Sequence, residues 1–149
     1  MKKFSFSLDK VLDYKQQLLE SVQAEHAAAL SELHQQENVV QEAWNSYRIY
    51  NEEFCESKKN GLMIAEALFY ERRLRAMEAR IQEETERLKQ LQKVEEQKRN
   101  AVIEVKKETA SLEKLKEKKL NLYQKAVQKS EETFIEEFVS NSRASNCSA

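Results

Sequence analysis

Hydrophobic residues follow a heptad pattern through the first part of the chain. From Leu8 to Phe54 the pattern positions are spaced alternately by four and three residues, and eleven of the fourteen are apolar. They are Leu8, Leu12, Lys15, Leu19, Val22, His26, Ala29, Leu33, Gln36, Val40, Ala43, Tyr47, Tyr50 and Phe54. Such a long series is typical of a coiled-coil seam. It predicts a helix over about residues 8–57, with Ser7 as its N-cap and Asp9 in its first turn.

The heptad pattern stops at Asn60-Gly61. Gly61 is the only glycine in 149 residues, and the chain has no proline. Asn and Gly adopt the left-handed conformation that ends a helix more readily than other residues. Lys58 and Lys59 suit the negative end of a helix dipole. The stretch therefore predicts the turn of a two-helix hairpin.

A second heptad pattern follows this turn. It runs through Met63, Ala67, Tyr70, Leu74, Met77, Ile81, Glu84, Leu88 and Leu91, weakens over residues 94–99, and continues through Val102, Val105, Thr109 and Leu112. It then splits into a stripe of Leu115, Leu122 and Ala126 and a stripe of Leu120, Tyr123, Val127, Phe134 and Phe138. The split indicates that the contact face rotates near residues 112–120. We expect a helix over about residues 62–139 and a disordered polar tail over residues 140–149.

These patterns predict an all-α fold, an antiparallel two-helix coiled-coil hairpin over residues 1–139 with a longer second helix. In this hairpin Leu8 lies opposite about Leu112, and the rest of the second helix extends for about 40 Å without an intramolecular partner. Phe4 and Phe6 precede the first helix in a short extended segment. We expect a second protein to bind at this open end, although fraying of an unpacked helix is a compatible alternative.

Charge is distributed unevenly between the two predicted helices. Residues 1–57 carry 5 basic and 10 acidic side chains, net −5, and residues 58–129 carry 19 basic and 12 acidic side chains, net +7. The simplest interpretation is that an acidic helix lies beside a basic one. We favour it over a nucleic-acid surface, because the basic residues alternate with Glu and lack an aromatic stacking platform.

Nothing in the sequence indicates catalysis, a metal site or a cofactor. A single glycine excludes a glycine-rich phosphate loop. His26 falls on the seam and His34 lacks further ligands at suitable spacing, so we interpret His26 as a polar seam residue rather than a metal ligand. Cys55 and Cys147 are too few for a disulfide framework and are consistent with a reducing compartment. No apolar run approaches the roughly 18 residues of a membrane span. We expect a non-enzymatic cytoplasmic protein without direct membrane insertion.

Aromatic residues gather on both sides of the turn. Trp44, Tyr47, Tyr50 and Phe54 lie on the first helix, and Phe69 and Tyr70 lie on the second. Tyr47, Tyr50 and Tyr70 fall on the seam, whereas Trp44 and Phe69 fall beside it and are expected to be partly exposed. Partly exposed Trp and Tyr are common interface anchors. The alternative is that these rings only widen the seam near the turn.

The N-terminal stretch KKFSFSLDKVLDYKQQLLE resembles the start of the flagellar export protein family FliJ, in which an aromatic-rich segment leads into a Leu-Asp-Lys-Val-Leu helix start. The single turn, the near absence of Gly and Pro and the Glu-Glu-Phe near the C-terminus also fit this family. The resemblance implies a coiled coil similar to the stalk subunit of rotary ATPases. It also implies a role in flagellar type III export, and hence in flagellum assembly, motility and chemotaxis.

The family resemblance also implies partners and the residues that bind them. The partners are the hexameric export ATPase, the cytoplasmic domain of the export gate FlhA, and export chaperones, which would hold the protein at the cytoplasmic face of the cell membrane. The candidate gate-binding residues are Val40, Trp44, Tyr47, Tyr50, Tyr70 and Met77, with Arg73 and Arg80 departing from the family's apolar pattern. The candidate ATPase-binding residues are Phe4, Phe6, Leu8, Val11, Leu12, Tyr123, Phe134 and Phe138.

The leading hypothesis is thus a monomeric rod that acts as a stalk and adaptor in flagellar export. A generic coiled-coil scaffold, in which Tyr123, Phe134 and Phe138 pair with another copy, is the second hypothesis. A helical arm that binds RNA through the basic face between Lys106 and Lys119 is the third. A concentration-dependent dimer would favour the second, and a steeply salt-dependent affinity for RNA would favour the third.

Overall fold

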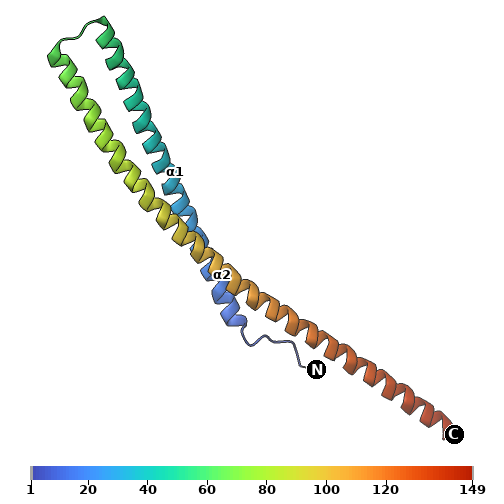
Figure 1. The fold of residues 1–149 in the computed structure, drawn as a ribbon. Helices are drawn as coiled ribbons and strands as arrows, with labels where there is room; N and C mark the ends of the chain where they lie inside the picture. Colours follow the sequence, from blue (N-terminus) through green and yellow to red (C-terminus); the bar gives the residue numbers. More distant parts are fainter. Residues whose placement is uncertain (1, 149) are drawn as a thin grey trace. The chain divides into compact units, whose positions relative to one another are not determined.

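The computed structural model describes residues 2–148 and contains two α-helices, α1 (Asp9–Asn60) and α2 (Ile64–Cys147) (Figure 1). No strand occurs within these described residues. The all-α prediction with a longer second helix is therefore confirmed. Contacts divide the chain into two compact units, Glu20–Ile103 and the pair of segments Met1–Leu19 and Glu104–Ala149. We call them the turn unit and the termini unit. This division is finer than the single hairpin expected from the sequence.

In the turn unit, the segments of α1 and α2 run antiparallel. Four side-chain pairs give the register: His26 with Glu95, Gln36 with Glu84, Tyr47 with Glu78, and Glu53 with Tyr70. The residue number on α2 falls steadily as the number on α1 rises, which is the pattern of a hairpin. The predicted antiparallel pairing around the turn is confirmed.

The seam on α1 follows the heptad positions closely. All fourteen positions from Leu8 to Phe54 are buried or half-buried. On α2 the seam also continues through residues 94–99, where the apolar pattern weakens, because half-buried Glu95 and Lys98 occupy the heptad positions. Glu95 bonds His26 at 3.0 Å, and the Lys98 ammonium lies 3.0 Å from the Glu25 carboxylate. A search for apolar residues alone misses such polar seam positions.

The chain reverses at Gly61, as predicted. This glycine has φ 90°, and no other residue of the described chain has a positive φ. Its N–H donates to the Lys58 carbonyl at 3.4 Å, and the Ala67 N–H donates to the Met63 carbonyl at 3.0 Å as α2 begins. Met63 itself is 72% exposed, so its assignment to the seam is wrong. It lies in the turn, before the first residue of α2.

Replacing Gly61 with alanine is expected to lower the free energy of unfolding by about 1 kcal/mol. A Cβ at this position would meet no atom within 4 Å, so the cost comes from the left-handed backbone alone. Gly61→Asn is the matched control and should cost less, because Asn tolerates this conformation. Urea unfolding followed by circular dichroism measures both changes. An unchanged or raised stability of Gly61→Ala would contradict the left-handed turn.

In the termini unit, the segment before α1 has no regular structure over residues 2–6 and a turn at residues 7–8. The Asp9 N–H donates to the Phe6 carbonyl at 3.1 Å, and the Leu8 carbonyl accepts from the Leu12 N–H at 2.8 Å. Leu8 rather than Ser7 therefore occupies the N-cap position, because its carbonyl accepts the first intrahelical bond. Asp9 lies in the first turn, as predicted.

The N-terminal segment packs against α2 within this unit. The Phe4 and Tyr123 ring centroids are 5.6 Å apart, and the Tyr123 hydroxyl donates to the Lys2 carbonyl at 2.7 Å. Phe6 is buried, with the Lys119 ammonium 5.8 Å from its ring centroid. Part of the α2 surface expected to lack an intramolecular partner is therefore covered. From residue 128 to residue 148 every side chain is exposed.

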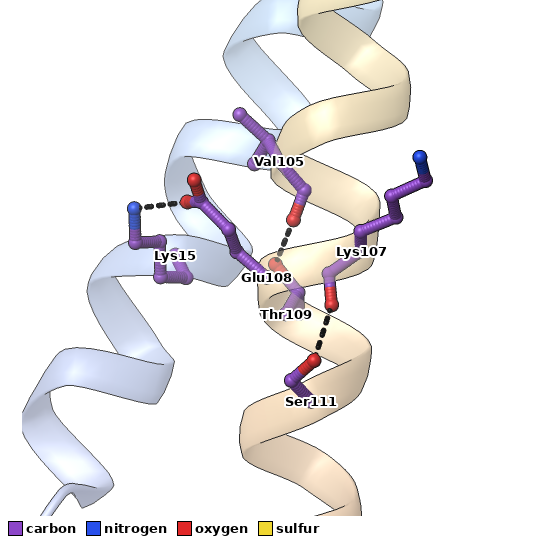
Figure 2. A network of polar contacts seen from close by, with 6 residues as sticks. All are labelled: Lys15, Val105, Lys107, Glu108, Thr109 and Ser111. Carbon is purple, nitrogen blue, oxygen red and sulfur yellow. Dashed lines mark hydrogen bonds and ion pairs between the residues drawn. The ribbon is translucent and has the colours of Figure 1, made fainter.

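Polar pairs also set the register of the termini unit. Lys116 lies 2.7 Å from Asp9, about one helical turn beyond the predicted pairing of Leu8 with Leu112. Lys15 of α1 also pairs with Glu108 of α2 (Figure 2). The hydroxyl of the buried Thr109 donates to the Val105 carbonyl of its own helix at 2.8 Å.

The phase shift expected near residues 112–120 is observed as two successive spacings of four residues between seam positions of α2. Half-buried Lys116 lies four residues after Leu112, and half-buried Leu120 lies four residues after Lys116, which breaks the 4-3 alternation once. Tyr123 and Val127, which are half-buried as well, continue the seam from Leu120. The alternative stripe of Leu115, Leu122 and Ala126 is exposed. The seam therefore moves by one position after Lys116 and continues on a single stripe.

The end of α2 also differs from the prediction. The helix was expected to end near Val139, with a disordered tail over residues 140–149, but it continues to Cys147. Side chains of this last segment are exposed and make only local bonds, such as that from the Ser145 hydroxyl to the Ser142 carbonyl at 3.0 Å. Ser and Asn favour turns and caps over helix interiors, which is why composition suggested a tail.

Candidate partner-binding surfaces

The aromatic cluster of the turn unit has a packed interior. Phe54 is buried and stacks on Tyr70 with ring centroids 5.0 Å apart and planes at 16°, and Tyr50 lies 5.1 Å from the same ring. The Lys58 ammonium lies 3.9 Å above Phe54, and the Arg73 guanidinium lies 5.0 Å from Tyr50. Tyr50 and Tyr70 are therefore half-buried supports of the hairpin, and only their outer edges can meet a partner.

Trp44 and Phe69 are the exposed aromatics of this cluster. They are 54% and 64% exposed, which confirms that they lie beside the seam. The Trp44 ring meets Tyr47 edge to face, with centroids 6.1 Å apart and planes at 83°. Val40 and Met77, the remaining candidates for this surface, are half-buried. Trp44 is the large exposed anchor of the predicted gate-binding set.

A surface groove of about 580 Å³ runs beside Trp44 and Tyr47. Its other lining residues come from α2: Glu78, Ile81, Gln82, Thr85, Glu86 and Lys89. Ile81 is buried and gives an apolar base, and the charged residues form a polar rim. An aromatic anchor over an apolar base with a polar rim is the usual composition of a protein-binding site.

The α2 side of this groove was not foreseen from the sequence. Glu78, Gln82, Thr85 and Lys89 are polar and lie off the seam, so an apolar pattern does not select them. Their spacing of four, three and four residues nevertheless places them on one stripe of the helix. That stripe, next to the seam and facing the Trp44 side, is the signal that could have identified them.

Tyr47 carries a perturbed hydroxyl at the edge of this groove. It donates to the Glu78 carboxylate at 2.9 Å. This hydrogen bond, with smaller contributions from desolvation and from the negative charge of Glu78, raises the pKa of Tyr47 above its ordinary value of 10.0. The neutral phenol is therefore favoured in the folded protein.

The substitution Glu78→Gln is expected to lower the pKa of Tyr47 towards its ordinary value, because a neutral acceptor no longer opposes the phenolate. In the wild type, the raised pKa contributes stability below pH 10, and this contribution is lost as the pH rises through the pKa of the folded state. Ultraviolet titration of the tyrosines in both proteins measures the shift. The control is Glu83→Gln, on an exposed residue to which Tyr47 does not bond. Equal titration curves for wild type and Glu78→Gln would contradict the bond.

The second candidate surface lies in the termini unit. Of its eight predicted residues, Phe6 and Leu12 are buried in the packing, and Phe4, Leu8 and Tyr123 are half-buried. Val11, Phe134 and Phe138 are 43%, 69% and 65% exposed. The structure adds Ile135 and Val139, which are also exposed next to the two phenylalanines. We call Phe134, Ile135, Phe138 and Val139 the α2 patch.

Other chemistry is limited within residues 2–148. No group of three His, Cys, Asp or Glu side chains there could hold a metal ion. His26 is half-buried on the seam and bonded to Glu95, in agreement with its interpretation as a polar seam residue. Cys55 and Cys147 are exposed free thiols. The described part of the chain also contains no helix with the length and apolar character needed to cross a membrane.

Comparison with known proteins identifies the family. No curated protein and no solved structure matches the chain significantly. The model of the family described as flagellar FliJ protein matches residues 4–146, which is nearly the whole chain. The match agrees with the two-helix fold and with the N-terminal sequence. The chain therefore belongs to the flagellar FliJ family, the components of flagellar protein export.

Proposed function

We propose that this protein is an adaptor of the flagellar type III export apparatus with two binding surfaces, which joins the export ATPase ring to the cytoplasmic domain of the gate FlhA. The observation that carries the proposal is that each unit has its own exposed aromatic surface: the groove beside Trp44 in the turn unit, and the α2 patch in the termini unit. Two separate surfaces allow one chain to bind two partners at once.

The groove beside Trp44 is the proposed gate-binding surface. Trp44 and Tyr47 supply aromatic area at little cost in side-chain entropy, and the buried Ile81 offers an apolar base for a partner side chain. Val40 and Met77 add half-buried apolar area. Tyr50 and Tyr70 contribute indirectly, because the contact between their rings holds the two helices together. The FlhA domain would place an apolar side chain in the groove and polar groups at its rim.

The α2 patch is the proposed ATPase-binding surface, together with Val11. Its apolar side chains lie on α2 beyond the part covered by the N-terminal segment. Phe4, Phe6, Leu8, Leu12 and Tyr123 support it indirectly, because they pack the N-terminal segment and α1 against α2. Such a surface suits a role like that of the stalk in a rotary ATPase.

The proposed role includes escort of export chaperones and does not include catalysis. Binding to the ATPase and the gate would keep the protein at the cytoplasmic face of the cell membrane. Loss of the protein is then expected to impair flagellum assembly, and with it motility and chemotaxis.

Separate substitutions in the two surfaces test the proposal. Trp44→Ala is expected to weaken binding to the purified FlhA cytoplasmic domain by about tenfold and to leave binding to the export ATPase unchanged. Phe134→Ser/Phe138→Ser is expected to do the reverse. Isothermal titration with each partner measures both affinities. Phe69→Ala is the matched control for Trp44→Ala, because Phe69 is an exposed aromatic of the same unit that does not line the groove beside Trp44.

Three outcomes would overturn the proposal. If neither partner binds the wild type and light scattering shows a concentration-dependent dimer, the protein is a self-associating scaffold. If it binds RNA with a steep dependence on salt and binds neither partner, it is an RNA-binding arm. If Trp44→Ala and Phe69→Ala weaken gate binding equally, the groove is not the gate-binding surface.

A further inference from the structure

The most exposed large apolar side chains of the described chain lie at the turn between the two helices. Met63 is 72% exposed and Ile64 is 82% exposed, and Leu68 follows on the next turn of α2 at 54%. Ile64 and Leu68 are four residues apart and therefore share one face of the helix. We call these three residues the turn patch. Clustered exposed apolar residues mark a binding surface more often than isolated ones do.

The stretch of chain that contains the turn patch carries a net positive charge. Residues 58–75 contain five basic residues, at 58, 59, 72, 73 and 75, and two acidic residues, at 66 and 71, net +3. Ile64, Leu68, Arg72 and Arg75 follow one another at spacings of four, four and three, so the apolar face becomes basic within about two helical turns. Lys59 adds positive charge from the last turn of α1.

The shape around the turn distinguishes the turn patch from a groove. A groove of about 720 Å³ near the turn is lined by residues that include Tyr50, Leu62 and Phe69, but not by Met63, Ile64 or Leu68. The turn patch is therefore exposed and does not line this groove. Exposed apolar side chains in a stretch of net positive charge suit a fluid anionic surface, which needs no complementary shape.

The α2 patch provides an internal comparison. It is also apolar and exposed, but residues 131–143 contain four acidic side chains and one basic side chain. An anionic surface would repel this patch and attract the turn patch. The opposite charges near the turn patch and the α2 patch therefore indicate that these two apolar surfaces bind different kinds of partner.

We propose that the turn patch inserts shallowly into the headgroup region of an anionic lipid bilayer. Met63, Ile64 and Leu68 would enter the boundary between headgroups and acyl chains, and Lys59, Arg72 and Arg75 would contact lipid phosphates. The sequence predicted no direct insertion because it lacks a spanning segment. Interfacial binding requires only a few apolar side chains and nearby positive charge, so a search for membrane-spanning segments does not detect it.

Sedimentation of the full chain with lipid vesicles tests this proposal. We expect binding to vesicles of phosphatidylcholine mixed with phosphatidylglycerol, weaker binding at high salt, and little binding to phosphatidylcholine alone. Met63→Ser/Ile64→Ser and Lys59→Glu/Arg72→Glu are each expected to weaken binding about tenfold. The matched control is Phe134→Ser/Ile135→Ser, which removes two comparably exposed apolar side chains from the acidic α2 patch and should leave vesicle binding unchanged.

Tryptophan fluorescence tests whether the turn itself enters the lipid. Met63→Trp in a Trp44→Phe background is expected to shift its emission to the blue with phosphatidylglycerol vesicles, while Trp44 of the wild type should not shift. Absence of vesicle binding, an equal loss in the α2 patch control, or an unshifted Met63→Trp emission would each overturn the proposal. So would a loss of FlhA affinity in Met63→Ser/Ile64→Ser without any vesicle binding by the wild type, since the turn patch would then be a protein-docking surface.

Discussion

Replacing Phe54 with alanine is expected to lower the free energy of unfolding by about 3 kcal/mol. Phe54 is only 4% exposed, and its ring stacks on Tyr70 and lies under the Lys58 ammonium. The substitution would remove the ring from the seam close to the turn and leave Tyr70 without the ring on which it stacks. Urea unfolding followed by circular dichroism measures the loss.

Phe69→Ala is the matched control for this prediction. Phe69 is 64% exposed, so its truncation should change the free energy of unfolding by no more than about 0.5 kcal/mol. A loss for Phe54→Ala as small as that for Phe69→Ala would show that the stacked rings contribute little to the stability of the turn unit.

Removing the polar contact between Gln36 and Glu84 is expected to stabilise the turn unit. Gln36 is 5% exposed, and its amide donates to the Glu84 carbonyl at 2.9 Å and to the Glu84 carboxylate at 2.5 Å. Gln36→Leu alone should cost about 1 kcal/mol, because the Glu84 carboxylate loses its partner. Gln36→Leu/Glu84→Leu should gain about 2 kcal/mol, because an apolar pair replaces a desolvated polar one. A double-mutant cycle by urea unfolding measures the coupling.

The same double variant is expected to lose specificity of pairing. A polar side chain on a coiled-coil seam fixes register and partner choice at a cost in stability. Light scattering of Gln36→Leu/Glu84→Leu should therefore show self-association that the wild type lacks. The control is Gln128→Ala/Glu132→Ala, which removes an exposed hydrogen bond of 3.2 Å and should leave stability and oligomeric state nearly unchanged. A less stable, strictly monomeric double variant would contradict this role for Gln36.

The fold could be predicted from the sequence wherever burial follows apolar character. The α1 seam and the Gly61 turn were correct, because a long 4-3 spacing and a single glycine each have one physical interpretation. The weak apolar pattern over residues 94–99 of α2 arises because polar residues occupy the seam positions. Half-buried Glu95 bonds His26 of α1 and half-buried Lys98 pairs with Glu25 of α1, and such contacts are visible only once both helices are aligned.

The candidate surfaces were predictable in part, for a related reason. Trp44 could be identified because its place beside the seam follows from helical spacing alone. The groove it borders could not, because its α2 wall of polar side chains depends on how the two helices pack. Covering of Tyr123 by the N-terminal segment was also missed, since a heptad pattern says nothing about residues outside helices.

The turn at Gly61 has a consequence for helix pairing when the protein is present at low concentration. Two separate helices with this seam would associate only when both were abundant, and would come apart as their concentration fell. Joining them through a short turn replaces that encounter by an intramolecular one, with an effective concentration on the order of millimolar. Helix pairing, and with it the groove beside Trp44, is then independent of how many copies the cell makes. A component present in few copies per export apparatus would gain most from this arrangement.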